Sequence, residues 1–372
     1  MIPMRYDLTT LPLAALLPAL VKAEDMLARL DERVLRHTVA DGFRERGHFF
    51  DAAGALWVGG ELVHVEDLVL HDARMDTRTP THELTIAHAV LRSRRRLWTA
   101  DPNWGLEPAG LAVLRGDVGE AEDAMAPRST LPDAMEPDEP EEDEDDFGVD
   151  FAEIDAILAR SDKILNGGVP EARQPTVDVE DPLALVRDED WDEGQRLESW
   201  RAVIREADLL PAALGAAVLF DAWERIEPLR RQHWLGGLLV SAYLRSRGKV
   251  TSHLFCLNVG LKAVRHDRRR APDRVTRLTA FLEAMALSAD SGLKELDRLS
   301  LARLQMELRL KDRRSNSSLP DVIDIVLSRP IVSAKMIARH VGVTSRGALN
   351  LVAELGLREM TGRGRYRGWG VL

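Results

Sequence analysis

The clearest pattern of apolar and polar positions lies near the carboxyl end of the chain. Between Ser333 and Leu355 apolar side chains recur at helical spacing, and Gly342 interrupts them where a tight turn would fall. The small Ala338, four residues before this glycine, would let two short helices cross closely. The pattern therefore predicts a helix-turn-helix, whose second helix is a standard device for reading the major groove of DNA.

The flanking residues extend this prediction to a whole domain. Apolar positions in residues 319–327 predict a preceding helix, and Ser333 and Thr344 are placed to cap the two later helices. Residues 358–371 predict two short strands around a glycine-flanked turn, with Trp369 packed against the helices. We therefore expect a winged helix-turn-helix domain over residues 313–372.

The polar positions of this domain predict a DNA-binding surface. If the apolar stripe of the last helix faces the core, Arg346 and Asn350 point outward, and these side chains match guanine and adenine edges. Thr and Ser commonly hold phosphates. Alternate arginines of the wing would point to one side of a strand, toward the DNA backbone or an adjacent minor groove. The predicted contact residues are Thr344, Ser345, Arg346, Asn350, Arg363, Arg365 and Arg367. The alternative is a winged helix that makes only protein contacts.

Upstream, successive helical patterns predict an all-α domain packed as a bundle, which we place at residues 150–312. A further helical spacing occurs at Phe151–Leu165, before a polar stretch. The remaining helices are expected at Gly194–Ala207, Leu210–Glu224, Trp234–Arg247, Leu254–Val264, Arg274–Leu287 and Ser288–Leu310.

Residues 1–114 predict a small α+β domain. Helical spacing at Leu11–Val39 and Thr81–Trp98 flanks a dense apolar region from Phe49 to Val65, whose breaks suggest short antiparallel strands. The cluster Arg92–Arg96 could bind phosphates, or it could stabilise a helix carboxyl end and solvate one face. The predicted fold class is thus mainly α, with a small α+β domain, a central helical bundle and a C-terminal winged helix-turn-helix.

An acidic segment separates the first two of these domains. Residues 131–150 hold eleven Asp and Glu and no Lys or Arg, and apolar periodicity is almost absent from residues 115–149. Such a segment cannot bury enough surface to offset its ordering entropy, so it predicts a disordered linker. The polyanion could mimic nucleic acid and compete for the basic C-terminal domain, or it could be a solubilising tether.

The charge distribution changes what the net charge of −11 implies. Residues 311–372 hold eleven Lys and Arg against five Asp and Glu, a net charge of +6 for that end. A basic end and an acidic segment elsewhere favour a nucleic-acid-binding protein.

The single cysteine, Cys256, excludes an internal disulfide framework and suits a reducing cytoplasm. The longest apolar stretch, Leu209–Phe220, is about half of what a membrane span requires, so we expect a cytoplasmic protein without a membrane partner.

Motifs for catalysis or metal binding do not occur in the sequence. The chain has no His-Glu-x-x-His spacing, no Gly-x-x-x-x-Gly-Lys-Ser/Thr phosphate loop and no Gly-x-Ser-x-Gly elbow. We therefore expect no metal, no cofactor and no enzymatic activity.

Three stretches of the chain resemble a known family. Residues 235–262, 274–314 and 319–372, including Asn350–Arg365, are similar to an uncharacterised alphaproteobacterial family that is common on rhizobial plasmids. That family pairs a helical domain of unknown function with a C-terminal helix-turn-helix DNA-binding domain. The resemblance implies this architecture and DNA binding, but no reaction and no target.

A weaker similarity leads to Fic-domain proteins, AMP-transferring enzymes that often end in a comparable winged helix. Their His-Pro-Phe-x-Asp/Glu-Gly-Asn-Gly-Arg motif is missing here, and the nearest segment, Gln232–Leu238, lacks the Asn-Gly-Arg end.

The first hypothesis for the function of the chain is a transcriptional regulator that binds double-stranded DNA, with the helical domain mediating homodimerisation or sensing a partner. The alternatives are a degenerate Fic-like protein and a plasmid or mobile-element accessory factor that acts by protein contacts.

Overall fold

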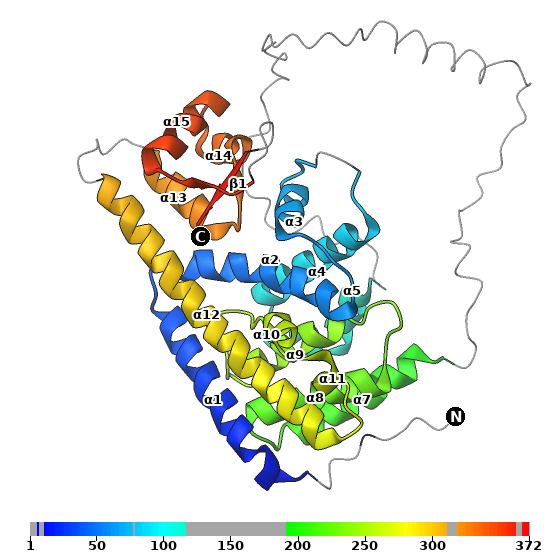
Figure 1. The fold of residues 1–372 in the computed structure, drawn as a ribbon. Coiled ribbons are helices and arrows are strands. Elements are labelled where there is room, and N and C mark those ends of the chain that lie inside the picture. Colours follow the sequence, from blue (N-terminus) through cyan, green and yellow to red (C-terminus); the bar gives the residue numbers. More distant parts are fainter. Residues whose placement is uncertain are drawn as a thin grey trace, which may run out of the picture. The chain divides into compact units, whose positions relative to one another are not determined.

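The computed structural model describes residues 6, 11–76, 79–116, 191–310, 318–361 and 367–371. Contacts divide the chain into two compact units, one formed by Met1–Gly119 with Asp192–Leu372 and the other by Glu120–Trp191. The helices and strands that the structure describes all belong to the first unit (Figure 1). The predicted acidic linker, apart from Arg115 and Gly116 at the end of α5, and the predicted helix at Phe151–Leu165 lie outside the described residues.

The described N-terminal region is helical. Its elements are α1 (Leu13–Leu35), α2 (Ala40–Gly59), α3 (Val65–Asp72), α4 (His82–Thr99), the 3-10 helix η1 (Trp104–Leu106) and α5 (Pro108–Arg115). The helices predicted at Leu11–Val39 and Thr81–Trp98 are confirmed as α1 and α4.

The prediction of short strands between Phe49 and Val65, and with it a small α+β domain, is wrong. Most of that region belongs to α2, which is buried on nearly all sides. A helix that is buried all round carries apolar residues on every face, so the period of 3.6 is lost and the dense apolar run resembles strands. Gly60, in the left-handed conformation at φ 96°, ends the helix at the predicted break.

The central region follows the predicted order of helices. It contains α7 (Glu193–Ala207), α8 (Ala212–Ile226), α9 (Leu235–Ser246), α10 (Leu257–Ala263), α11 (His266–Arg269) and α12 (Arg274–Leu310). The two helices predicted at Arg274–Leu287 and Ser288–Leu310 are one continuous helix of 37 residues. No proline occurs between Arg274 and Leu310, and the one glycine, Gly292, is accommodated inside the helix, so the backbone ladder continues.

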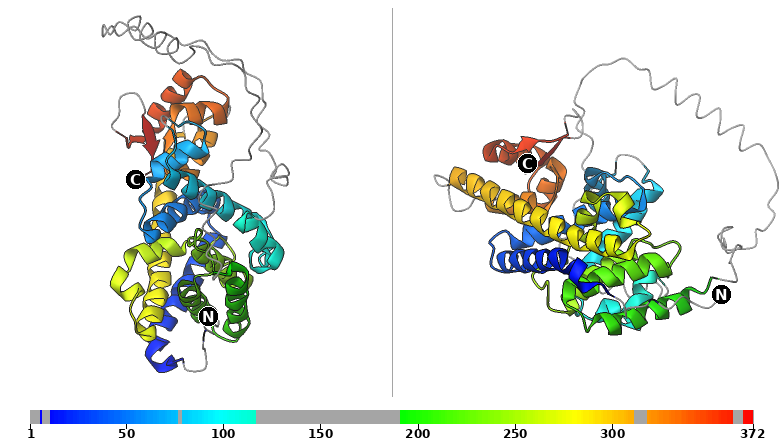
Figure 2. Two further views of the ribbon diagram at one scale, coloured as in Figure 1. Left: turned by 90° about the vertical axis from the view of Figure 1, so that its right-hand side faces the viewer. Right: turned by 60° about the horizontal axis from the view of Figure 1, so that its bottom comes forward.

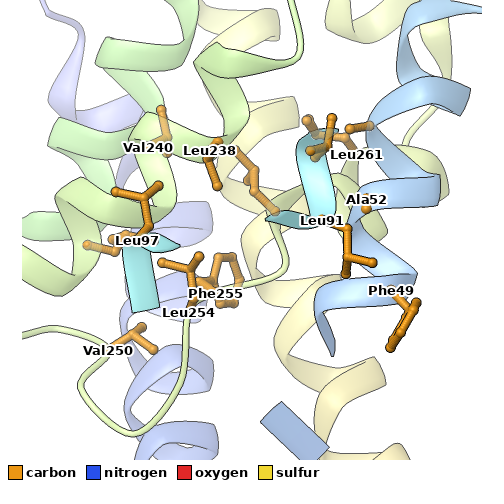
Figure 3. Close-up of a cluster of buried hydrophobic side chains, with 14 of the residues drawn as sticks. Phe49, Ala52, Leu91, Leu97, Leu238, Val240, Val250, Leu254, Phe255 and Leu261 are labelled. Atoms are coloured by element: carbon orange, nitrogen blue, oxygen red, sulfur yellow. The ribbon is translucent and has the colours of Figure 1, made fainter. Parts of the chain in front are cut away.

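The N-terminal and central helices share one hydrophobic core. Helix α1 lies along α12, and α2 packs on α4 and α10 (Figures 1 and 2). In Figure 3, Phe49 from α2 and Leu91 from α4 lie in the same cluster as Leu238 and Leu261 from α9 and α10. Close approach of α10 to α12 depends on Gly260, where an added Cβ would lie 1.9 Å from the carbonyl oxygen of Ala284.

Buried polar groups tie the same helices together. The fully buried Arg94 pairs with Asp51 and donates from Nη2 to the carbonyl oxygen of Leu254 at 3.0 Å. The neighbouring Arg95 pairs with Glu45 and with Asp72. Two arginines of the predicted basic cluster at Arg92–Arg96 are therefore engaged inside the protein, which favours a structural role over phosphate binding.

The C-terminal region contains three helices and a small sheet. The elements are α13 (Leu319–Ser328), β1 (Val332–Ser333), α14 (Ala334–Val341), α15 (Ser345–Leu355), β2 (Arg358–Glu359) and β3 (Gly368–Gly370). The sheet has the order β1-β3-β2 with antiparallel pairs, and Trp369 stands opposite both Val332 and Glu359. The predicted helices and the two predicted strands are confirmed, while β1 was not predicted.

Candidate nucleic-acid interface

The turn between α14 and α15 is built on Gly342. This residue has φ 72°, a left-handed conformation that side chains rarely adopt. Its N–H donates to the carbonyl oxygen of Ala338 at 2.9 Å, and the N–H of Val343 donates to the same oxygen at 3.1 Å. Ala338 itself is buried where the two helices meet. These contacts set the angle between the two helices, as the sequence predicted.

Both predicted helix caps are present. Ser333 Oγ accepts a hydrogen bond from the N–H of Met336 at 3.2 Å, and Thr344 Oγ1 accepts one from the N–H of Gly347 at 3.1 Å. Each cap satisfies one backbone N–H that would lack a partner in the first turn of its helix. The Thr344 cap therefore fixes where α15 begins and which side chains form its exposed first turn.

Helix α15 has one buried and one exposed face. Ala348, Val352 and Leu355 are buried, and Leu351 is half-buried. The exposed side chains are those predicted for the opposite face: Ser345, Arg346, Leu349, Asn350 and Ala353. Within the described part of the chain, neither Arg346 nor Asn350 has a hydrogen-bond or ion-pair partner. Their polar groups are therefore available to an outside ligand.

The segment that carries the exposed face of α15 is basic. From Ser333 to Ala353 the sequence contains Lys335, Arg339 and Arg346 and no Asp or Glu, and all three basic residues are exposed. The free N–H groups at the start of α15 add partial positive charge at the same end. Such a surface attracts a phosphate backbone.

The structure describes only part of the predicted wing site. Arg363 and Arg365 lie outside the described residues. Arg367 is exposed and donates from Nε to Glu359 Oε2 at 3.0 Å, across the two strands that flank the turn. Trp369 is buried in the sheet, so the prediction that it packs the wing against the helices is confirmed.

Sequence reasoning missed how the helix-turn-helix contacts the other helices. An added Cβ at Gly42 of α2 would lie 2.9 Å from the carbonyl oxygen of Leu327 in α13, so the two helices nearly touch. Arg46 Nη1 donates to the carbonyl oxygen of Arg329 at 2.5 Å. Arg298 Nη1 in α12 donates to the carbonyl oxygen of Val371 at 3.1 Å. No signal in the sequence marked Arg46, which belongs to the charged run Arg44-Glu45-Arg46.

The segment nearest to the Fic motif has a packing role. Gly236 and Gly237 lie inside the buried helix α9. An added Cβ at Gly236 would lie 2.3 Å from Trp223 Cδ1, and one at Gly237 would lie 3.0 Å from Asn258 Oδ1. These glycines let neighbouring side chains approach the helix and do not form a phosphate-binding turn.

Neither a metal-binding cluster nor a membrane-spanning helix occurs among the described residues. In the described ranges, no group of three or more His, Cys, Asp or Glu side chains is placed to hold a metal ion. None of the helices that the structure describes is long and apolar enough to cross a membrane.

This geometry defines a DNA-binding protein of the helix-turn-helix class, and residues 319–372 match the family model described as "HTH DNA binding domain". Residues 185–311 match the family described as "Protein of unknown function (DUF1612)". The chain is 45% identical over 386 residues to the uncharacterized protein y4cF of Sinorhizobium fredii, an alignment that covers 99% of this chain and 100% of the relative. The chain therefore belongs to the same family as this rhizobial protein, as the resemblance in the sequence implied.

Proposed function

We propose that this protein is a sequence-specific regulator of transcription in the cytoplasm, rather than an enzyme, and that α15 enters the major groove of its operator. The observation that carries the proposal is the exposed face of α15. It presents Arg346 and Asn350 without partners among the described residues, in a segment with no acidic residue from Ser333 to Ala353.

Each side chain of this face has a proposed role. Arg346 would bond to the O6 and N7 edge of guanine, and Asn350 to the N6 and N7 edge of adenine. Thr344 and Ser345, at the positive end of the helix, would contact phosphates. The division between base and phosphate contacts predicts which substitutions change sequence preference and which change affinity alone.

The wing would act as a clamp on the DNA backbone through Arg363, Arg365 and Arg367. Arg367 is paired with Glu359 in the free protein, and its side chain is 56% exposed. An exposed pair of this kind contributes at most ~1 kcal/mol, so Arg367 can exchange the carboxylate for a phosphate. We propose that the domain in this way works as a winged helix.

We also infer that the regulator binds as a homodimer. Leu301, Leu304 and Leu308 are more than half exposed on α12, at spacings of three and four residues. This spacing is that of a coiled-coil seam, which pairs best with a second apolar seam. The same helix contacts the helix-turn-helix where Arg309 donates to the carbonyl oxygen of Leu355. A dimer through α12 would therefore bring two recognition helices to one operator.

Selection of bound sequences from a random DNA pool with the full-length protein tests the proposal. We expect enrichment of a palindrome whose half-sites are separated by a whole number of helical turns. Anisotropy should then show tighter binding to the enriched sequence than to a scrambled one at the same salt concentration. If no sequence is enriched and no DNA binds at low salt, the proposal is wrong and the accessory factor that acts by protein contacts takes its place.

A further inference from the structure

A cavity of about 240 Å³ lies among α1, α2, α10 and α12, apart from the DNA-binding face. Its walls are mostly apolar and include Leu30, Phe43, Phe50, Phe255 and Val259, and the exposed Ser291 stands at its edge. An apolar cavity of roughly 150 Å³ is large enough to bind benzene. This cavity therefore has room for a molecule of one or two rings.

The wall contains one buried histidine with an unused ring nitrogen. His253 is 2% exposed, and its ring packs edge-on against Phe43 at a centroid distance of 5.4 Å. Its Nδ1 lies 2.9 Å from Ser252 Oγ. Among the residues that the structure describes, Nε2 has no hydrogen-bond partner. Nε2 is not one of the fully enclosed polar atoms of the described residues, so it is open to the cavity, where water or a bound molecule can satisfy it.

The neighbours of His253 determine what its Nε2 can bind. Ser252 Oγ donates to Asp31 Oδ1 at 2.7 Å. Burial opposes ionisation of Asp31, but the hydrogen bonds from Ser252 and Thr251 outweigh it and lower the pKa of this carboxyl. Because the Ser252 hydroxyl donates to a carboxylate, its oxygen accepts from Nδ1–H of His253. Nε2 is then a bare acceptor, and it requires a ligand with an O–H or N–H donor.

The other polar groups at the cavity favour an uncharged ligand. Burial lowers the pKa of His253 to about 4 and raises the pKa of the Cys256 thiol to about 12, so both are neutral near pH 7. Glu295 also lines the cavity, and its carboxylate would repel an anion. An anionic ring compound would therefore lose its hydration and gain no cation inside the cavity.

Glu295 connects the cavity with both ends of the helix-turn-helix. Its carboxylate lies 2.8 Å from Arg46 Nε and 2.5 Å from Arg298 Nη2. Arg46 also holds the carbonyl oxygen of Arg329, next to α13, and Arg298 holds that of Val371, next to β3. A ligand that displaces Glu295 would change both contacts at once.

We propose that this cavity binds a small, uncharged ring compound with one O–H or N–H donor, and that its occupation acts on the helix-turn-helix through Glu295. The second half of this inference rests on the proposed function, since it makes the ring compound an effector of DNA binding. The first half stands on the cavity alone.

Calorimetry with the full-length protein tests the binding site. The probes are indole and benzyl alcohol, with benzoate as the anionic counterpart of benzyl alcohol. We expect saturable binding of at least one uncharged probe and much weaker binding of benzoate. The substitution His253→Phe should weaken binding roughly tenfold, because it keeps a ring but removes the acceptor. If neither uncharged probe binds, or if benzoate binds as well as they do, the site is wrong.

Two substitutions at exposed positions test the same site, because His253→Phe changes a buried residue and could disturb the fold. Ser291→Trp should close the edge of the cavity from an exposed position and abolish binding. Lys294→Trp is the matched control, since this exposed residue of the same helix does not line the cavity. Equal loss of binding in both variants, or in neither, would contradict the assigned entrance and with it the site.

Hydrogen exchange at β1 and β3, together with operator affinity, tests the coupling. Saturating indole should change exchange of Val332 and Trp369 and shift operator affinity several-fold, and Glu295→Gln should remove both effects. Indole bound with no change at either strand would overturn the coupling. If the protein binds indole but no DNA, the proposed function is wrong and the binding site still holds. If it binds DNA but no ring compound, the binding site is wrong and the proposed function still holds.

Discussion

Arg46 and Glu295 form an ion pair of 2.8 Å between α2 and α12, with side chains only 2% and 19% exposed. The same guanidinium donates to the carbonyl oxygen of Arg329, at the end of α13. Removing two charges from water is costly, and their mutual attraction roughly offsets that cost when the geometry is good. The pair therefore contributes more to the placement of the helix-turn-helix on the helices around it than to net stability.

Loss of Arg46 should be strongly destabilising. In Arg46→Ala, the largely buried Glu295 keeps only Arg298 as a partner, and the carbonyl oxygen of Arg329 loses its donor. We expect the free energy of unfolding to fall by about 3 to 5 kcal/mol. Urea unfolding measures this free energy. The matched control is Arg33→Ala, whose pair with Asp297 joins side chains that are 47% and 61% exposed, and the expected change there is below ~1 kcal/mol. Equal effects of the two substitutions would contradict the buried network.

The cap of the recognition helix should contribute measurably to stability. Thr344→Ala removes the acceptor for the N–H of Gly347 and should lower the free energy of unfolding by about 1 kcal/mol. Thr344→Ser keeps an acceptor at the same place and should be nearly neutral. Thermal unfolding of the two variants compares them directly, and identical melting temperatures would show that the cap is not formed.

Substitutions in α15 and in the wing should have different effects on DNA binding. Arg346→Ala should lower discrimination between the selected operator and a variant site by about 1–3 kcal/mol, because a base contact is lost. Arg365→Ala should weaken binding to all sequences and flatten the dependence of affinity on salt, because a phosphate contact is lost. Anisotropy titrations at several salt concentrations separate the two. Arg29→Ala, an exposed arginine of α1, serves as the control and should change neither quantity.

Acidification should destabilise the protein in part through His253. Burial lowers the pKa of this residue to about 4 in the folded chain, against 6.5 for an ordinary histidine. Between these values the unfolded chain binds the proton and the folded chain does not, so stability falls as the pH drops from 6.5 to 4. The loss from this one group is about 3 kcal/mol. Urea unfolding across this range should show a shallower fall for His253→Phe, and parallel curves would contradict the assignment.

The leucine seam of α12 should determine the oligomeric state. Leu304→Glu places a charge in the middle of the exposed stripe and should shift sedimentation from dimer to monomer. Operator affinity should fall with it, because two half-sites are no longer bound together. The control is Leu209→Glu, the same substitution at a leucine that is 87% exposed and lies outside α12, which should leave the dimer unchanged. A wild-type protein that sediments as a monomer would remove the dimer from the proposed function.

Local spacing was enough to predict the helix-turn-helix. Gly342, the caps Ser333 and Thr344 and the exposed face with Arg346 were all correct, because turns, caps and amphipathic faces depend on residues a few positions apart. The same reasoning failed for α2. Its environment comes from α4, α10, α12 and α13, which are distant in sequence, so its apolar residues carry no single-faced pattern.

The sequence by itself determined the class of DNA-binding domain, the basic character of that end and most helix boundaries, because these follow from contacts within one or two turns. Only the tertiary structure decided that the N-terminal and central helices share one core. It also decided that Arg94 is an internal ion-pair partner and that His253 lines a cavity. A cavity, a buried charge pair and the placement of one domain on another are made by residues up to hundreds of positions apart, and no local pattern encodes them.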